Sequence, residues 1–170
     1  MKVFINAGHG GNDPGAVSKN GTKEKDINLQ ISALLAQRLI ALGYDVEFFR
    51  QKKSLTEVAY TENSSDSDLF ISIHCNSATN PTANGVEVLY YPTSVKGKKY
   101  AQLVQEELVK STKLKNRGIK PRTDLNVLKK TFAPAMIVEL AFLSNINEEK
   151  LLLENPEMFV NGILNGILKI

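Results

Sequence analysis

The chain has 170 residues, of which 42% are hydrophobic and 23% are charged, a composition typical of one soluble globular domain with no room for a second module. Basic residues exceed acidic residues by 21 to 18, and they form no basic cluster, zinc finger or aromatic RNA-binding motif, so we expect no nucleic-acid partner. A single cysteine, Cys75, excludes an intramolecular disulfide.

The first residues do not read as a targeting segment. The apolar run there covers Val3 to Ile5 and then meets a glycine-rich turn, whereas a secretory signal needs about 7 to 15 apolar residues. No run approaches the roughly 20 apolar residues of a membrane span. We therefore expect no signal peptide in the chain as given and no membrane insertion.

Short apolar runs alternate with longer helical patterns along the chain. Strands are expected at 3–5, 45–49, 69–73, 85–91 and 135–140, and helices at 27–39, 55–63, 100–109, 148–154 and 157–168. The stretch 116–128 is expected to be a loop with room for one short strand. This order predicts a single α/β domain with a mostly parallel central sheet and helices on both faces.

Both histidines of the chain lie where a parallel sheet binds ligands. His9 follows the first predicted strand by a few residues, and His74 directly follows the strand at 69–73. Ligands gather outside the carboxyl ends of such strands. A single histidine is more often an ordinary surface or core residue, but two of two at the same edge favour a site.

A carboxylate is expected at the same edge. Glu139 ends an apolar run, where an unpaired charge is costly to bury. One interpretation pairs Glu139 with a lysine or arginine from a loop. The other is catalytic, because a half-buried carboxylate beside a metal-bound water has a reason to hold and transfer a proton.

Two histidines and one carboxylate around an open position make a typical catalytic zinc set. Spacing alone does not choose the carboxylate. Three acidic residues lie between the His9 loop and the first helix: Asp13, Glu24 and Asp26. An acidic residue near a helix N-terminus is also favoured by the helix dipole alone, so the third ligand stays open.

Two other chemistries find little support. The glycines around His9 do not form a phosphate-binding loop, because the dinucleotide pattern needs glycine where the chain has Asp13, and no Walker lysine follows. Cys75 is a weak nucleophile candidate, since neighbours on a strand point to opposite faces and Cys75 therefore points away from His74. We expect a buried, unreactive thiol.

Four ordered segments carry a resemblance to a known family. They read NAGHGGNDPGA at 6–16, EKDINL at 24–29, DLFISIHCN at 68–76 and PAMIVELAFLSN at 134–145, with further likeness at 117–120 and 124–128. Together they resemble the zinc-dependent N-acetylmuramoyl-L-alanine amidases of the autolysin and endolysin type, the amidase 3 family. The likeness runs over nearly the full length of the chain.

The resemblance implies that His9, Glu24 and His74 bind one zinc ion and that Glu139 is the catalytic carboxylate. It implies one catalytic domain over 1–170 with about six strands. The expected reaction is hydrolysis of the peptidoglycan amide between N-acetylmuramic acid and L-alanine of the stem peptide. We further expect Asn76 to contact the substrate, the chain to be a monomer, and its site of action to be the cell wall, in an extracellular or periplasmic setting.

Three positions depart from the family pattern. Asn6 stands where an aspartate is usual, Val58 where an arginine is common, and Ala141 where a glycine is common. Asn6 brings no charge to support the first histidine, which predicts weaker metal affinity. Two alternative functions remain, namely a zinc peptidase acting within the stem peptide and a catalytically silent wall-binding module; the intact four-residue set argues against the second.

Overall fold

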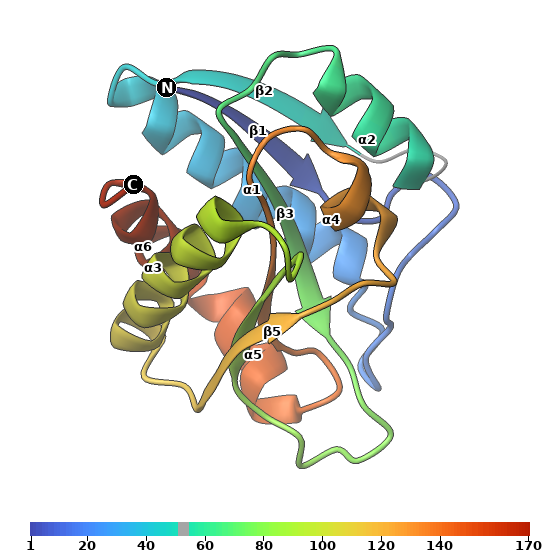
Figure 1. The fold of residues 1–170 in the computed structure, drawn as a ribbon. Coiled ribbons are helices and arrows are strands. Elements are labelled where there is room, and N and C mark those ends of the chain that lie inside the picture. The colour runs from blue at the N-terminus through green and yellow to red at the C-terminus, as the bar shows by residue number, and fades with distance from the viewer. Residues whose placement is uncertain (51–54) are drawn as a thin grey trace.

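The computed structural model describes residues 1–50 and 55–170 and contains a six-stranded sheet in the order β2-β1-β3-β6-β4-β5 (Figure 1). The strands are β1 (Lys2–Ala7), β2 (Asp45–Arg50), β3 (Leu69–Asn76), β4 (Val86–Tyr90), β5 (Asn116–Pro121) and β6 (Ala135–Phe142). The helices are α1 (Glu24–Ala41), α2 (Leu55–Asn63), α3 (Val95–Thr112), α4 (Asn126–Lys130), α5 (Ile146–Glu154) and α6 (Pro156–Ile167).

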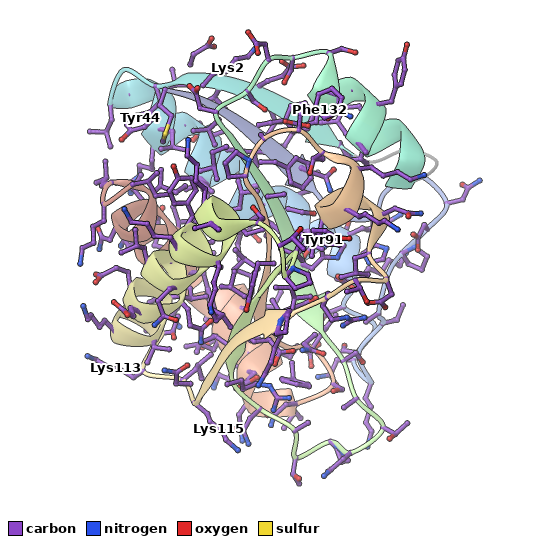
Figure 2. The ribbon with its side chains drawn as sticks, viewed as in Figure 1. Lys2, Tyr44, Tyr91, Lys113, Lys115 and Phe132 are labelled. Carbon is purple, nitrogen blue, oxygen red and sulfur yellow. The ribbon has the colours of Figure 1, made fainter. Side chains whose placement is uncertain are left out.

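The sheet is mostly parallel, as predicted. β1 pairs in parallel with β2 and β3, β3 with β6, and β4 with β5, whereas β4 and β6 pair antiparallel. One edge of the sheet therefore combines the carboxyl ends of β1, β3 and β6 with the amino ends of β4 and β5. In Figure 2, Lys2 at the start of β1 and Lys115 just before β5 lie at opposite ends of the molecule, as this reversal requires.

Two apolar layers cover the sheet, one on each face. The larger layer joins strand residues such as Ile5, Ile71 and Val138 to buried residues of α1, α3 and α6. The smaller layer joins Phe4 and Phe70 to residues of α2 and α4. Helices on both faces were predicted, and they leave the edge where β1, β3 and β6 end as the place for a site.

The smaller layer explains one departure from the family pattern. Val58 of α2 is fully buried and belongs to the cluster that contains Phe4 and Phe70. An arginine there would bring a charge into an apolar layer, at a cost unless it were paired. Valine is thus consistent with the packing of this chain.

Two expectations about the elements need correction or completion. The 116–128 stretch contains β5, the expected short strand, and also α4, a helix too short to show a periodic pattern. β3 and β6 both extend past their predicted ends. His74 consequently lies within β3 and not beyond it, and Glu139 lies inside β6, as it does in the predicted strand. Among the described residues, no helix is both long and apolar enough to cross a bilayer.

Candidate active site

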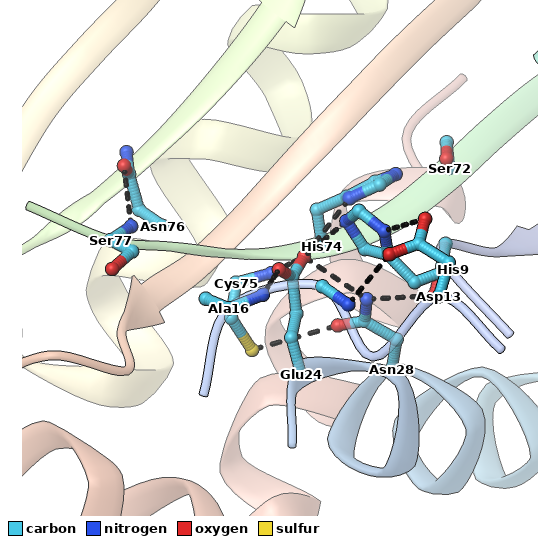
Figure 3. Close-up of polar contacts among 12 residues, drawn as sticks. His9, Asp13, Ala16, Glu24, Asn28, Ser72, His74, Cys75, Asn76 and Ser77 are labelled. Atoms are coloured by element: carbon cyan, nitrogen blue, oxygen red, sulfur yellow. Dashed lines mark hydrogen bonds and ion pairs between the residues drawn. The ribbon is translucent and has the colours of Figure 1, made fainter. Parts of the chain in front are cut away.

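Three polar side chains from three different elements meet at the carboxyl edge of the sheet. His9 comes from the loop after β1, Glu24 begins α1 and His74 lies near the end of β3 (Figure 3). The Glu24 Oε1 atom is 3.3 Å from His9 Nε2 and 3.1 Å from His74 Nδ1. Candidate ligand atoms of the three residues all lie within 4.8 Å of one another. Two ring nitrogens and a carboxylate oxygen at this spacing suit a zinc ion.

The glycine-rich loop brings its backbone unusually close to this group. The Gly8 amide donates to the Ile73 carbonyl at 3.0 Å, which ties the loop to β3. A Cβ atom on Gly8 would overlap the His74 ring, and one on Gly15 would come within 2.6 Å of Glu24 Oε2. His9 itself adopts a left-handed backbone conformation with a φ of 61°. The glycines are therefore required by close approach and not by phosphate binding.

Glu24 is buried, and several donors surround its carboxylate. Oε2 accepts a hydrogen bond from the Ala16 amide at 2.8 Å, and Oε1 accepts from the Cys75 amide at 3.1 Å. Burial alone raises the pKa of Glu24, but its bonds to His74 and His9 outweigh burial and hold the pKa well below its usual range. Glu24 is therefore a stable anion, which is what a cation ligand requires.

His9 is held on both sides of its ring. Its Nε2 faces Glu24, while its Nδ1 is 2.8 Å from Asp13 Oδ2. The hydrogen bond with Glu24 and then that with Asp13 raise the pKa of His9 to about 9, against an opposing effect of burial. In the absence of a metal, His9 thus carries a proton at neutral pH.

The structure distinguishes between the three acidic residues that residue spacing left as candidates for the third metal ligand. Glu24 joins both histidines, whereas Asp13 contacts the far nitrogen of His9. Within the described part of the chain, Asp26 is not a member of any such group. Glu24 is the first residue of α1, and its carboxylate points at the two histidines. Hydrophobic periodicity along the chain does not reveal this orientation.

Glu139 lies next to this group on the neighbouring strand. It is paired in register with His74 across β3 and β6. Its Oε2 atom is buried and has no hydrogen-bond partner among the described residues. Burial is the main cause that raises the pKa of Glu139 to about 7. A carboxyl group with this pKa can both accept and return a proton near neutral pH.

A second carboxylate, which sequence reasoning did not single out, faces Glu139 from β4. Glu87 is its antiparallel partner in register. The Glu87 carboxylate accepts from Asn76 Nδ2 at 2.8 Å and from Arg117 Nε at 2.9 Å, and the Arg117 guanidinium lies 4.8 Å from the centre of the Phe142 ring. Because β4 runs antiparallel to β6, the amino end of β4 lies beside the carboxyl end of β6 and contributes to the site. A search limited to residues at the carboxyl ends of strands misses Glu87.

Asn76 and Asn6, both expected near the site, have internal partners. Besides its bond to Glu87, Asn76 accepts from the Ser77 amide through Oδ1 at 2.9 Å (Figure 3). The buried Asn6 donates to Ser72 Oγ at 2.8 Å. The acidic residue recorded at His9 Nδ1 is Asp13, and the weaker metal affinity expected from Asn6 stays a prediction.

Cys75 follows His74 on β3 and points to the other side. Its thiol is buried and lies 3.5 Å from Asn28 Oδ1, toward α1 (Figure 3). Burial raises the pKa of the thiol well above its usual value. A protonated, buried thiol is a poor nucleophile, in line with the sequence expectation.

With this geometry in hand, comparison with known proteins identifies the family. A family model described as N-acetylmuramoyl-L-alanine amidase matches residues 3–169. The chain belongs to this amidase family. Among curated members, it is 33% identical to the N-acetylmuramoyl-L-alanine amidase CwlM of Bacillus licheniformis, covering 98% of this chain and 65% of the relative. It is 34% identical to the endolysin of Bacillus phage SPP1, covering 96% of this chain and 62% of the endolysin.

Solved structures of amidases share the fold over almost the whole chain. An N-acetylmuramoyl-L-alanine amidase from Clostridium difficile 630 superimposes with a TM-score of 0.90 at 35% identity, covering 99% of this chain and 95% of that one. The catalytic domain of the amidase CwlV from Bacillus (Paenibacillus) polymyxa gives 0.92 at 28% identity, with 99% and 96% covered. The six-stranded sheet is therefore the architecture of the family. This amidase chain nonetheless spans about two thirds or less of the two curated relatives named above.

Proposed function

We propose that this chain is a peptidoglycan hydrolase that cleaves the amide between the lactyl group of N-acetylmuramic acid and L-alanine of the stem peptide. The observation that carries the proposal is the meeting of His9, Glu24 and His74 near Glu139, whose buried Oε2 atom has no partner among the described residues, in a chain of the amidase family. Relatives named as amidases and as an endolysin add support.

The donor set fits one zinc ion. His9 would offer Nε2, His74 Nδ1 and Glu24 a carboxylate oxygen, since these atoms face one another. Three protein ligands of this kind leave a position for water or substrate. When bound, zinc supplies Lewis-acid chemistry, which polarises the scissile carbonyl and acidifies the attacking water.

Glu139 performs the proton transfers in the proposed reaction. Its carboxylate takes a proton from the attacking water as the water oxygen bonds to the carbonyl carbon. It returns that proton to the alanine nitrogen as the carbon–nitrogen bond breaks, so the products are a free lactyl carboxylic acid and a free amine. No histidine is left for this task, since both rings face Glu24.

Glu87, near the amino end of β4, bonds both Arg117 near the amino end of β5 and Asn76 at the carboxyl end of β3. We propose that the side of β4 and β5 receives the substrate and that Asn76 takes part in its contacts. The Glu87 carboxylate fixes the amide of Asn76 in orientation, which lowers the conformational cost of binding. The proposal includes action as a monomer on the cell wall, outside the cytoplasm.

Digestion of purified peptidoglycan tests the bond that is cleaved. We expect mass spectrometry to show stem peptides with a free L-alanine N-terminus and glycan strands without peptide. Chelation of the metal should abolish their release, and zinc should restore it. Peptides shortened within the stem would instead identify a zinc peptidase, and wall binding without any release would identify a silent binding module.

Metal content tests the ligand set separately. We expect close to one zinc per chain by elemental analysis of the parent protein, and a sharp drop in His74→Ala because one of three ligands is lost. Glu106→Gln, an exposed change on α3, serves as the control and should keep the metal. Unchanged zinc content in His74→Ala would contradict the ligand set.

A further inference from the structure

The Asp13 carboxylate connects the His9 ring to the backbone of its own loop. Asp13 Oδ2 is 2.8 Å from His9 Nδ1, and Oδ1 accepts from the Gly15 amide at 3.0 Å. The Asp13 backbone also exchanges two hydrogen bonds of 3.0 Å with Gly10. Both carboxylate oxygens are thus engaged, and the loop that carries His9 closes on the residue that contacts its ring.

This contact decides which His9 nitrogen faces the site. A carboxylate at Nδ1 favours the tautomer with its proton on that nitrogen, which leaves the lone pair on Nε2. Nε2 is the nitrogen that lies 3.3 Å from Glu24 Oε1, inside the group of candidate ligands. The two sides of the ring therefore have different roles, one holding the proton and one facing the cation.

Neither Asn6 nor Asn28, the other polar side chains near the loop, is recorded at His9 Nδ1. The Asn6 amide donates to Ser72 Oγ, and both residues are fully buried in the sheet. The Asn28 side chain donates to the Gly8 carbonyl at 3.0 Å and to Glu24 Oε1 at 3.3 Å. Among the described residues, Asp13 is the one carboxylate recorded at His9 Nδ1.

We infer that Asp13 is a positioning residue that fixes the tautomer and orientation of His9 as a metal ligand. The inference rests on the proposed function, because it assumes that His9 binds zinc. A competing interpretation treats Asp13 and His9 as an ordinary surface ion pair, since the Asp13 side chain is 56% exposed. Such a pair would matter little for metal binding.

Zinc affinity separates the two interpretations. The dissociation constant is measured by competition with a chromophoric chelator for the parent, Asp13→Ala, Asp13→Asn and the control Asp26→Asn. Loss of an outer partner of a ligating histidine typically weakens metal affinity about 10- to 100-fold. We expect a loss in this range for Asp13→Ala and a smaller one for Asp13→Asn, whose amide oxygen still accepts from Nδ1. Asp26→Asn removes the same charge from the same segment and should bind zinc as the parent does.

A spectroscopic readout tests the tautomer directly. Long-range proton–nitrogen correlation spectra of the zinc-loaded protein should show His9 protonated at Nδ1 in the parent and Asp26→Asn, with that signature weakened in Asp13→Ala. Zinc affinity of Asp13→Ala within twofold of the parent, or an equal loss in Asp26→Asn, would overturn the inference. Failure of the proposed function is distinguishable, since the parent itself would then bind no zinc. If Asp13→Ala does not fold, Asp13→Asn carries the same comparison.

Discussion

Two carboxylates of the same site lie in opposite surroundings. Glu24 receives backbone donors from Ala16 and Cys75 and faces two imidazole rings, whereas Glu139 has a buried oxygen without a partner among the described residues. The pKa of Glu24 is held low despite its burial, and the pKa of Glu139 is raised to about 7 by burial. The difference lies in hydrogen bonding: donors around a buried carboxylate favour its charged form, whereas burial without such donors favours its neutral form.

The largest expected effect comes from removing the Glu139 carboxylate, the proposed proton acceptor. Glu139→Gln keeps the shape of the side chain but not its ability to accept a proton, so we expect amide hydrolysis to fall about 10²- to 10⁴-fold. Zinc content should not change, because Glu139 lies outside the ligand group. The measurement is the rate of amine release from peptidoglycan, with Glu106→Gln as control. A Glu139→Gln protein as active as the parent would assign the proton transfer to another residue.

The same substitution should change stability in a pH-dependent way. In the metal-free protein the pKa of Glu139 rises from its ordinary 4.5 to about 7 on folding. Ionisation of Glu139 therefore opposes folding, and the stability loss accumulates as pH rises from about 4.5 to about 7 and is complete above that. Glu139→Gln should then stabilise the metal-free fold by on the order of 3 kcal/mol at pH 8 and by about 1 kcal/mol or less at pH 5.

Urea unfolding of both proteins at the two pH values checks this, because other titrating groups cancel in the difference. An equal difference at pH 5 and pH 8 would show that the pKa of Glu139 is not raised in the fold.

Gly8→Ala tests the surroundings of Glu24, where the glycine-rich loop packs closely against the His74 ring. The added methyl group would overlap the His74 ring, so the ring or the loop must move. Displacement of a ligand should weaken zinc affinity by about the 10- to 100-fold typical of disturbed outer contacts. Chelator competition measures it, and Ala16→Gly, which removes a methyl group while keeping the backbone bond to Glu24, is the control. Parent-like zinc binding by Gly8→Ala would show that the loop has room to shift.

The smallest expected effect is the pH dependence of zinc affinity, because zinc must displace a proton from His9. The bonds to Glu24 and Asp13 raise the pKa of His9 to about 9, so His9 is protonated at pH 7, and metal ligation requires the neutral ring. Zinc binding at pH 7 should release about one proton, and affinity should rise about tenfold per pH unit up to the pKa of His9. Calorimetry in buffers with different ionisation enthalpies measures the release. A binding enthalpy independent of buffer would contradict this prediction.

Much of the fold was predictable because its signals are local. The apolar runs that became β1, β3 and β6 and the periodic pattern of α1 follow from residues close together in the chain. The reversed direction of β4 depends on its pairing with β6, a contact between distant segments, and no local pattern records it. The helix α4 was missed because one turn and a half gives no periodicity to read.

The site was predictable in part for a similar reason. His9, His74 and Glu139 could be placed at one edge because each follows or ends an apolar run. The choice of Glu24 over Asp13 and Asp26 needed the family resemblance, since all three lie in one short stretch. Glu87 and Arg117 were not singled out, because their nearness to Glu139 depends on the antiparallel strand β4.

The strand order also bears on when the protein becomes active during its synthesis. The central strands β1, β3 and β6 are neighbours in the sheet, yet they come from the start, the middle and the last quarter of the chain. Closing such distant pairs is slow and cannot begin until the later strand exists. A chain in which β6 has not yet joined the sheet holds His9, Glu24 and His74 but lacks Glu139, so the proposed hydrolysis cannot begin before β6 is in place.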